Sequence, residues 1–231
     1  MIAQTGVGKS FILQNLAQIT APLQTILFEL ELPEELLHQR FTSLHAEIGH
    51  DMVRDTYNSG EKLGVEGWKK LGHVWICTES VLTLEQLETH TENAELKIGE
   101  KPKVVMIDYI QLMLGDGDRR ERTSDIAEGG KRFAKRAGVI LIITSQTRRK
   151  PNEQKEVYLT DGKESGSIEN SSGLVLGMWV DEKDSKKLTV KVLKNTKGES
   201  GKEIPCHFKP GLNGAFTGKI VEEVKVEGVD L

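Results

Sequence analysis

The chain has 231 residues, of which 37% are apolar and 29% charged, and its formal net charge is −4. No apolar run approaches about 18 residues, the length that a membrane-spanning helix needs, and the N-terminus lacks a secretory signal, so we expect a cytoplasmic protein with no membrane partner. Two cysteines and six histidines fall at no spacing typical of a disulfide framework or a metal site, which favours buried or incidental roles for all eight.

The first feature in chain order is a phosphate-binding loop at residues 3–10. It matches the P-loop pattern G-x-x-x-x-G-K-[ST], except that Ala3 stands at the first glycine. Glycines let the backbone point its N–H groups at a polyphosphate, the lysine reaches the β- and γ-phosphates, and the serine hydroxyl binds Mg²⁺. We therefore expect a nucleotide and Mg²⁺ at this loop, with Ser10 as a metal ligand. The predicted nucleotide-binding residues are Ala3, Gln4, Thr5, Gly6, Val7, Gly8, Lys9 and Ser10.

The position of this loop is unusual. A P-loop normally follows a buried β-strand, yet only Met1 and Ile2 precede this one. We therefore expect the first strand to be missing and the chain to be an N-terminally truncated piece of a longer protein. The apolar run from Phe11 to Leu16 predicts a helix after the loop, whose N-terminal dipole also favours an anion.

Strands and helices are predicted to alternate through the rest of the first half. Pro33 followed by two glutamates is typical of a helix N-terminus. In the helix that closes this half, Leu84, Leu87 and Ala94 are the expected inward positions. The predicted elements are a strand at 24–30, a helix at 33–48, short helices and loops at 49–72, a strand at 73–77 and a helix at 83–96.

The second half begins with two near-continuous apolar runs, 103–108 and 139–144, which are typical of strands buried on both faces of a parallel sheet. A basic helix at 123–137 precedes the second run, and a polar loop at 146–163 follows it. Antiparallel strands are then predicted at 174–180, 187–194, 203–208 and 215–224. This order predicts an α/β fold, with a mostly parallel central sheet and antiparallel C-terminal strands, in one domain over residues 1–231.

Candidate catalytic side chains follow the predicted strands, where open α/β sheets bind their ligands. Asp108 closes the run Val-Val-Met-Ile-Asp, which is typical of the Walker-B carboxylate that holds Mg²⁺. Glu29 and Glu31 end the second strand, and either carboxylate could activate a water as general base. Gln146 follows the 139–144 run and is placed to contact a γ-phosphate.

Six motifs resemble those of the RecA-type motor domain of DnaB-like replicative DNA helicases of bacteria and phages. They are A-Q-T-G-V-G-K-S at 3–10, F-E-L-E-L at 28–32, D-Y-I-Q-L-M at 108–113, S-Q-T-R-R at 145–149, E-S-G-S-I-E at 164–169 and K-N-T-K-G-E-S-G at 194–201. The fifth is identical to the family motif, and the third differs at one position. Together they occur in the family's order and cover essentially the whole chain.

The resemblance implies a RecA-like ATPase in a homo-hexameric ring, with ATP bound between neighbouring subunits. It further implies ATP-driven movement on single-stranded DNA, unwinding of duplex during replication, and a helicase loader and primase as partners. It selects Glu31 over Glu29 as the catalytic base and assigns Gln146 to sensing the γ-phosphate. We expect the family's N-terminal domain and linker helix to be absent from this chain.

The sequence departs from the family where an arginine finger is expected. In the family that arginine reaches the neighbouring subunit's ATP and stabilises charge on the transferred phosphoryl group. Thr196 takes its place here, so we expect Lys194 or Lys197 to substitute in part, since lysine lacks the bidentate fork of arginine. Lys163 likewise replaces the arginine that precedes E-S-G-S-I-E.

Charge is uneven along the chain. Residues 1–100 carry seven Lys and Arg against fifteen Asp and Glu, whereas residues 101–231 carry 24 against 20. Only a local basic surface in the second half could therefore bind nucleic acid. By the resemblance, such a surface would lie on loops that line the channel of the ring. The expected DNA-binding residues are Arg119, Arg120, Arg122, Arg148, Arg149, Lys150, Lys163, Glu164, Ser165 and Gly166.

Two other functions stay open. A RecA- or RadA-type recombinase or mediator ATPase would share the core but form filaments, and the motifs at 108–113 and 164–169 disfavour it. A non-hydrolysing, nucleotide-gated partner module is favoured by the missing finger arginine. DNA-stimulated ATP turnover would separate these functions.

Overall fold

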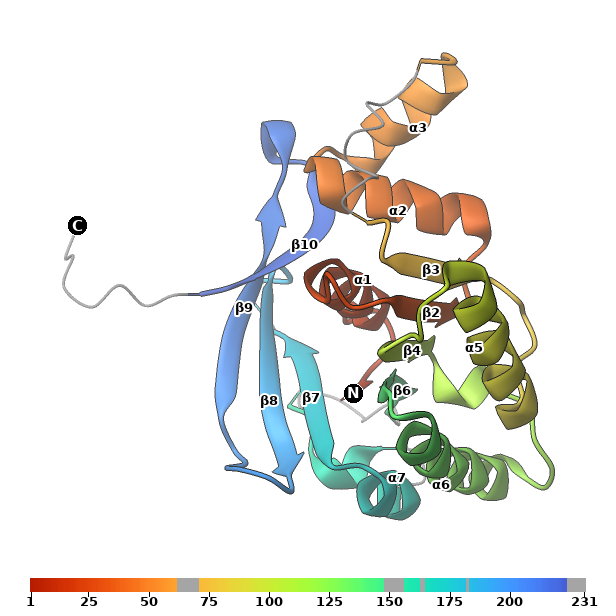
Figure 1. Ribbon diagram of the computed structural model, residues 1–231. Coiled ribbons are helices and arrows are strands. Elements are labelled where there is room, and N and C mark those ends of the chain that lie inside the picture. The colour runs from red at the N-terminus through yellow and green to blue at the C-terminus, as the bar shows by residue number, and fades with distance from the viewer. Residues whose placement is uncertain (62–70, 148–155, 163–164, 182, 224–231) are drawn as a thin grey trace.

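The computed structural model describes residues 1–61, 71–147, 156–162, 165–181 and 183–223 (Figure 1). Its helices are α1 (Lys9–Ile19), α2 (Glu34–Ala46), α3 (His50–Asn58), α5 (Leu84–Ile98), α6 (Arg119–Ala137) and α7 (Ser165–Ser171). The strands are β1 (Ile2–Ala3), β2 (Thr25–Glu29), β3 (Val74–Cys77), β4 (Val104–Asp108), β5 (Ile140–Ile143), β6 (Ser145–Gln146), β7 (Leu174–Val180), β8 (Lys187–Asn195), β9 (Glu203–Pro210) and β10 (Phe216–Glu222). The first half of the chain is thus rich in helices, and its C-terminal part consists of long strands.

The strands form two hydrogen-bonded sheets. One is parallel, in the order β3-β2-β4-β5, and the other is mixed, in the order β10-β9-β8-β7-β1-β6. In the mixed sheet β1 pairs parallel with β6 and β7, while β7, β8, β9 and β10 pair antiparallel in succession. The expected parallel core with antiparallel C-terminal strands is therefore confirmed, although its ladders are divided between two sheets.

A short strand does precede the P-loop, where we expected none. Ile2 and Ala3 pair with β6 on one side and with β7 on the other. Both residues are buried, at 2% and 0% exposure. The P-loop therefore starts from a strand of two residues between β6 and β7, and this pairing corrects our expectation of a missing anchor.

β5 is less buried than its apolar sequence predicted. Ile140 is 58% exposed, and the other three residues are half-buried. An apolar cavity of about 730 Å³ is lined by β5, by the start of β7 and by α6. Burial on both faces holds for β4, where every residue is buried, but is wrong for β5, because its residues line this cavity.

Capping residues decide where two helices begin. Thr83 accepts a hydrogen bond from the N–H of Gln86 (3.1 Å), and the Gln86 side chain accepts one from the N–H of Thr83 (2.8 Å). This capping box starts α5. Asp118 and Glu121 form a second box, so α6 begins at Arg119, earlier than the predicted residue 123. Within the described parts of the chain, no helix is long and apolar enough to cross a membrane.

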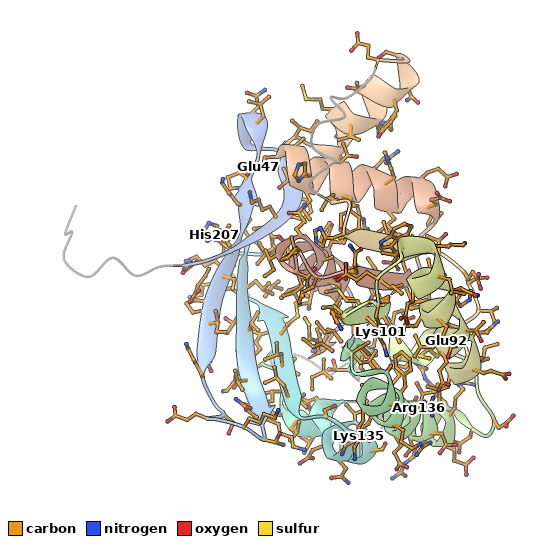
Figure 2. The ribbon with its side chains drawn as sticks, in the orientation of Figure 1. Glu47, Glu92, Lys101, Lys135, Arg136 and His207 are labelled. Atoms are coloured by element: carbon orange, nitrogen blue, oxygen red, sulfur yellow. The ribbon has the colours of Figure 1, made fainter. Side chains whose placement is uncertain are left out.

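Charged side chains connect distant elements across the surface. Glu47, the C-cap of α2, is labelled in Figure 2. It contacts Lys209 of β9 (2.8 Å) and Lys219 of β10. Hydrogen bonds from these two ammonium groups lower the pKa of Glu47. On the other side, Arg136 of α6 pairs with Glu88 of α5. These contacts hold the C-terminal hairpin to α2, and α6 to α5.

Candidate nucleotide-binding site

The P-loop backbone turns sharply between β1 and α1. Gly6 has a φ of 84° and Gly8 a φ of 107°, values that only glycine adopts without strain. A Cβ on Gly8 would also lie 3.0 Å from the Cζ of Phe208. Helix α1, described over its full length, has no acidic residue in its first turn and no side-chain cap. Its N-terminal N–H groups and dipole are thus available to an anion.

Lys9, the first residue of α1, is only 7% exposed. Its Nζ donates to the carbonyl oxygen of Gln4 (3.1 Å). Burial lowers the pKa of Lys9, and the negative charges of Asp108 and Glu31 oppose that shift. The three predicted residues therefore belong to one electrostatic site, although they come from the P-loop, the end of β4 and the segment after β2.

Asp108 ends β4 and is 1% exposed. Its Oδ1 accepts a hydrogen bond from the hydroxyl of Thr144, whereas Oδ2 is buried without a hydrogen-bond partner among the described residues. A buried carboxylate oxygen is costly unless another group binds it. A Mg²⁺ ion held by Ser10 and Asp108 would satisfy this oxygen, so the buried carboxylate fits the predicted cation.

The two glutamates at the end of β2 differ in their surroundings. Glu29 is 1% exposed and pairs with Asp108 of β4. Its Oε1 accepts hydrogen bonds from the N–H groups of Glu31 and Leu32, both at 3.2 Å. Burial and the nearby charge of Asp108 raise the pKa of Glu29 to about 8. Glu31 is exposed, so it is the carboxylate that water can reach.

Arg40 of α2 is a site residue that the motifs did not reveal. Its guanidinium interacts electrostatically with Glu29, Asp108 and Glu31, and its Cζ lies 4.7 Å from the centroid of the Phe11 ring. Burial lowers the pKa of Arg40. This side chain adds a second positive charge, besides Lys9, that interacts with Asp108 and Glu31. The sequence signal that could have revealed Arg40 is its position on the helix that follows the F-E-L-E-L motif at 28–32.

Hydrogen bonds connect the predicted γ-phosphate sensor to the segment after β4. The Gln146 side chain interacts with the Tyr109 hydroxyl and opposes the rise of its pKa, and the Gln146 N–H donates to Oε1 of Gln111 (3.2 Å). Gln111 Nε2 donates in turn to Oγ of Ser145 (2.7 Å). Tyr109 and Gln111 were not singled out from the sequence, although both belong to the motif at 108–113. Their contacts show that this motif fixes the strand carrying Gln146.

A family model described as the DnaB-like helicase C terminal domain matches residues 1–214. The chain belongs to the DnaB-like helicase C-terminal domain family. It is 28% identical over 198 residues to the replicative DNA helicase DnaB of Pasteurella multocida (strain Pm70), covering 78% of the chain and 41% of that relative. It is 30% identical over 163 residues to the DnaB of Rickettsia typhi (strain Wilmington), covering 67% of this chain and 33% of that relative. The chain thus spans less than half the length of these relatives.

Solved structures share the fold of this DnaB-like domain. A DnaB-like replicative helicase, described with its interactions with primase, gives a TM-score of 0.79 at 21% identity, covering 95% of this chain and 56% of that one. A second solved structure, described as an ATPase domain, gives a TM-score of 0.80 at 21% identity, covering 96% of this chain and 83% of that one. The RecA-like ATPase fold expected from the motifs is therefore confirmed.

In this DnaB-like domain, the two finger candidates lie away from the P-loop. Lys194 pairs with Val175 near the start of β7, whereas the P-loop residue Ala3 pairs further along that strand. The Lys194 ammonium donates to a backbone carbonyl of α7, and Lys197 is exposed in the turn after β8. The structure does not bring either lysine to the nucleotide site of its own chain.

The predicted DNA-binding residues of this DnaB-like domain are only partly described. Arg119, Arg120 and Arg122 lie in the first turn of α6 and not in a loop, because Asp118 caps the helix before them. Arg119 and Arg120 are exposed, and Arg122 is half-buried. Ser165 and Gly166 begin α7. The remaining candidates lie outside the described residues: Arg148, Arg149, Lys150, Lys163 and Glu164.

Proposed function

We propose that this domain is the motor of an ATP-dependent replicative DNA helicase. It would hydrolyse ATP between the subunits of a homo-hexameric ring, move on single-stranded DNA and unwind duplex during replication. The observation that carries the proposal is the electrostatic convergence of Lys9, Asp108 and Glu31 beside the open N-terminus of α1. These groups are the ones that phosphate binding, cation binding and water activation require.

Each residue has a separate task in this reaction. The backbone of residues 3–10 and the Lys9 ammonium bind the phosphates of ATP. Mg²⁺, when held by Ser10 and Asp108, offsets the negative charge of those phosphates. Glu31 accepts a proton from the water that attacks the γ-phosphorus. Arg40 keeps positive charge next to the carboxylates when water is excluded.

Gln146 connects nucleotide state to the DNA side of the domain. Its side chain interacts with Tyr109, whose pKa is raised by burial and by Glu31 and lowered by Arg119. Gln146 would bind the γ-phosphate before hydrolysis and release it afterwards. Tyr109 also interacts electrostatically with Arg119, in the first turn of α6. A change at Gln146 would therefore be transmitted through Tyr109 to Arg119.

The first turn of α6 supports a DNA-binding role for its arginines. Cations near a helix N-terminus are unfavourable to the helix dipole, so helix stability does not require Arg119, Arg120 and Arg122 there. Their guanidinium groups would instead bind the phosphates of single-stranded DNA with little sequence preference. The other expected DNA-binding residues, 148–150 and 163–166, would complete this surface.

A second copy of the chain would complete the nucleotide site. Because Lys194 and Lys197 do not reach their own P-loop, they are suited to contact the nucleotide of a neighbouring subunit. Either would stabilise the transferring phosphoryl group as a point charge, less effectively than arginine. Primase is a further proposed partner, since a similar helicase interacts with it. A helicase loader is another. We propose that the helicase and these partners act in the cytoplasm.

ATP turnover with and without single-stranded DNA at low salt tests the proposal. We expect DNA to stimulate hydrolysis and Glu31→Gln to reduce it by about 10²–10⁴-fold, the usual contribution of a general base. Glu29→Gln is the matched control, because Glu29 is buried and bonded to backbone N–H groups. Absence of DNA-stimulated turnover, or normal turnover in Glu31→Gln, would contradict the motor and favour a non-hydrolysing nucleotide-gated module.

Mixing inactive subunits tests the completion of the site by a neighbour. Lys9→Ala removes phosphate binding, and Lys194→Ala with Lys197→Ala removes the finger candidates. A mixture of the two variants should recover part of the activity, because some interfaces then combine an intact P-loop with intact lysines. Lack of recovery in mixtures that light scattering shows to be co-assembled would place the finger elsewhere. Unwinding of a forked duplex, with rings rather than filaments in micrographs, separates the helicase from a recombinase.

A further inference from the structure

Three side chains of types that can ligate a metal meet at the edge of the parallel sheet. Cys77 ends β3, Glu79 follows it, and His90 lies on α5, which flanks this side of the sheet (Figure 1). One ligand atom from each residue lies within 4.8 Å of the other two. The nucleotide site uses none of them. We propose that Cys77, Glu79 and His90 bind a zinc(II) ion or a similar thiophilic divalent cation.

The donor set decides the chemistry of the ion. One thiolate, one imidazole nitrogen and one carboxylate oxygen are ligands that zinc accepts, whereas Mg²⁺ and Ca²⁺ prefer oxygen alone. Three protein ligands leave a fourth tetrahedral position for water. The thiolate and the carboxylate together balance the charge of a divalent ion. Binding would release the Cys77 thiol proton to solvent.

The surroundings already hold the ligands near these positions. His90 Nε2 lies 3.1 Å from Glu79 Oε2, and Cys77 and Glu79 are separated by a single residue after β3. The His90 ring packs at 5.9 Å from the Phe28 ring, while Cys77 packs against the core beside Phe28. The Glu79 side chain is 53% exposed and that of His90 27%. A cation can therefore enter from solvent and meet ligands with an apolar wall behind them.

The proposed ion would join β3 to α5. Cys77 pairs with Phe28 of β2, the residue directly before Glu29. An ion at this position would therefore fix the part of the sheet edge that borders the nucleotide site. The proposal does not depend on ATP hydrolysis, and its failure would leave the proposed helicase function untouched.

Cobalt(II) spectroscopy on the full chain tests the site. The protein is stripped with a chelator, kept reduced with a phosphine, and saturated with Mg²⁺ and ADP so that the nucleotide site takes no probe ion. We expect Co²⁺ to give a sulfur-to-cobalt charge-transfer band at one equivalent and Zn²⁺ to remove that band. Such a band requires a bound thiolate, and Cys206, the second cysteine of the chain, is buried in β9.

Variants assign the band to its ligands. Cys77→Ser should abolish it, whereas Cys206→Ser, the matched control, should leave it unchanged. Glu79→Gln alters an exposed carboxylate, so the fold should persist while zinc binding weakens by at least about tenfold. Lack of the band in the unaltered protein, its survival in Cys77→Ser, or unchanged zinc affinity in Glu79→Gln would each overturn the site.

Discussion

The hydroxyl of Thr144 donates a hydrogen bond to Oδ1 of Asp108, and the other carboxylate oxygen of Asp108 is buried without a partner among the described residues. Thr144 is itself fully buried, at 0% exposure. One oxygen of the predicted Mg²⁺ ligand is thus fixed by the protein, and the other is available to a cation. We therefore expect Thr144, which lies between β5 and β6, to act on the proposed cation site through Asp108.

Removing this hydroxyl should weaken cation binding. We expect Thr144→Val to raise the Mg²⁺ concentration needed for half-maximal ATP hydrolysis by about 10–100-fold, as the loss of an outer-shell partner does. Stability should fall by about 1–3 kcal/mol, because a buried carboxylate oxygen loses its donor. Thr144→Ser keeps the hydroxyl and is the control. Equal Mg²⁺ dependence in both variants would show that Thr144 does not orient Asp108.

The raised pKa of Glu29 predicts a pH dependence of stability. The unfolded chain loses this proton near pH 4.5, while the folded chain keeps it until about pH 8. The folded state therefore binds the extra proton in this range, so stability falls as the pH rises from about 4.5 to about 8.

Urea denaturation of Glu29→Gln and the unaltered protein measures this effect. The glutamine keeps an oxygen for the backbone N–H groups but has no proton to lose. Its stability relative to the unaltered protein should increase with pH by at most about 1.4 kcal/mol per unit between pH 5 and 8. A difference that does not vary with pH would mean that Glu29 titrates normally in the fold.

Gly8→Ala should abolish nucleotide binding. The φ of Gly8 is 107°, which strains any residue with a side chain, and an added Cβ would also lie 3.0 Å from the Phe208 ring. Gly99→Ala is a matched control, because Gly99 also has a positive φ, 77°, but meets nothing within 4 Å at the end of α5. Binding of a fluorescent ADP should be lost in the first variant and kept in the second. Loss in both would point to general destabilisation.

Neutralising the arginines at the start of α6 should reduce DNA binding and its salt dependence. If Arg119, Arg120 and Arg122 each contact one phosphate, changing all three to Gln should reduce the slope of log affinity against log salt by about 2 for single-stranded DNA. In the control, Arg132, Lys135 and Arg136, which lie in the last two turns of the same helix, are changed to Gln. Lys135 and Arg136 are labelled in Figure 2. Equal losses in the two triple variants would indicate a nonspecific charge effect.

Sequence patterns predicted the features that depend on neighbouring residues. The buried strand at Val104–Asp108 follows from its unbroken apolar run, and the P-loop from its glycine and lysine spacing. Prediction was poorer where an element depends on distant partners. The apolar run of β5 gave no sign that one edge would border a cavity, and the start of α6 depended on the Asp118 cap.

The sequence by itself determined the P-loop, the Walker-B strand and the family, because each is encoded by residue types at short, fixed spacings. Only the tertiary structure decided which side chains meet. Packing of α2 against β2 brings Arg40 to the carboxylates, sheet register places Thr144 beside Asp108, and α5 brings His90 to Cys77. These pairs lie on separate elements, so their distances depend on how helices and strands pack and not on any spacing along the chain.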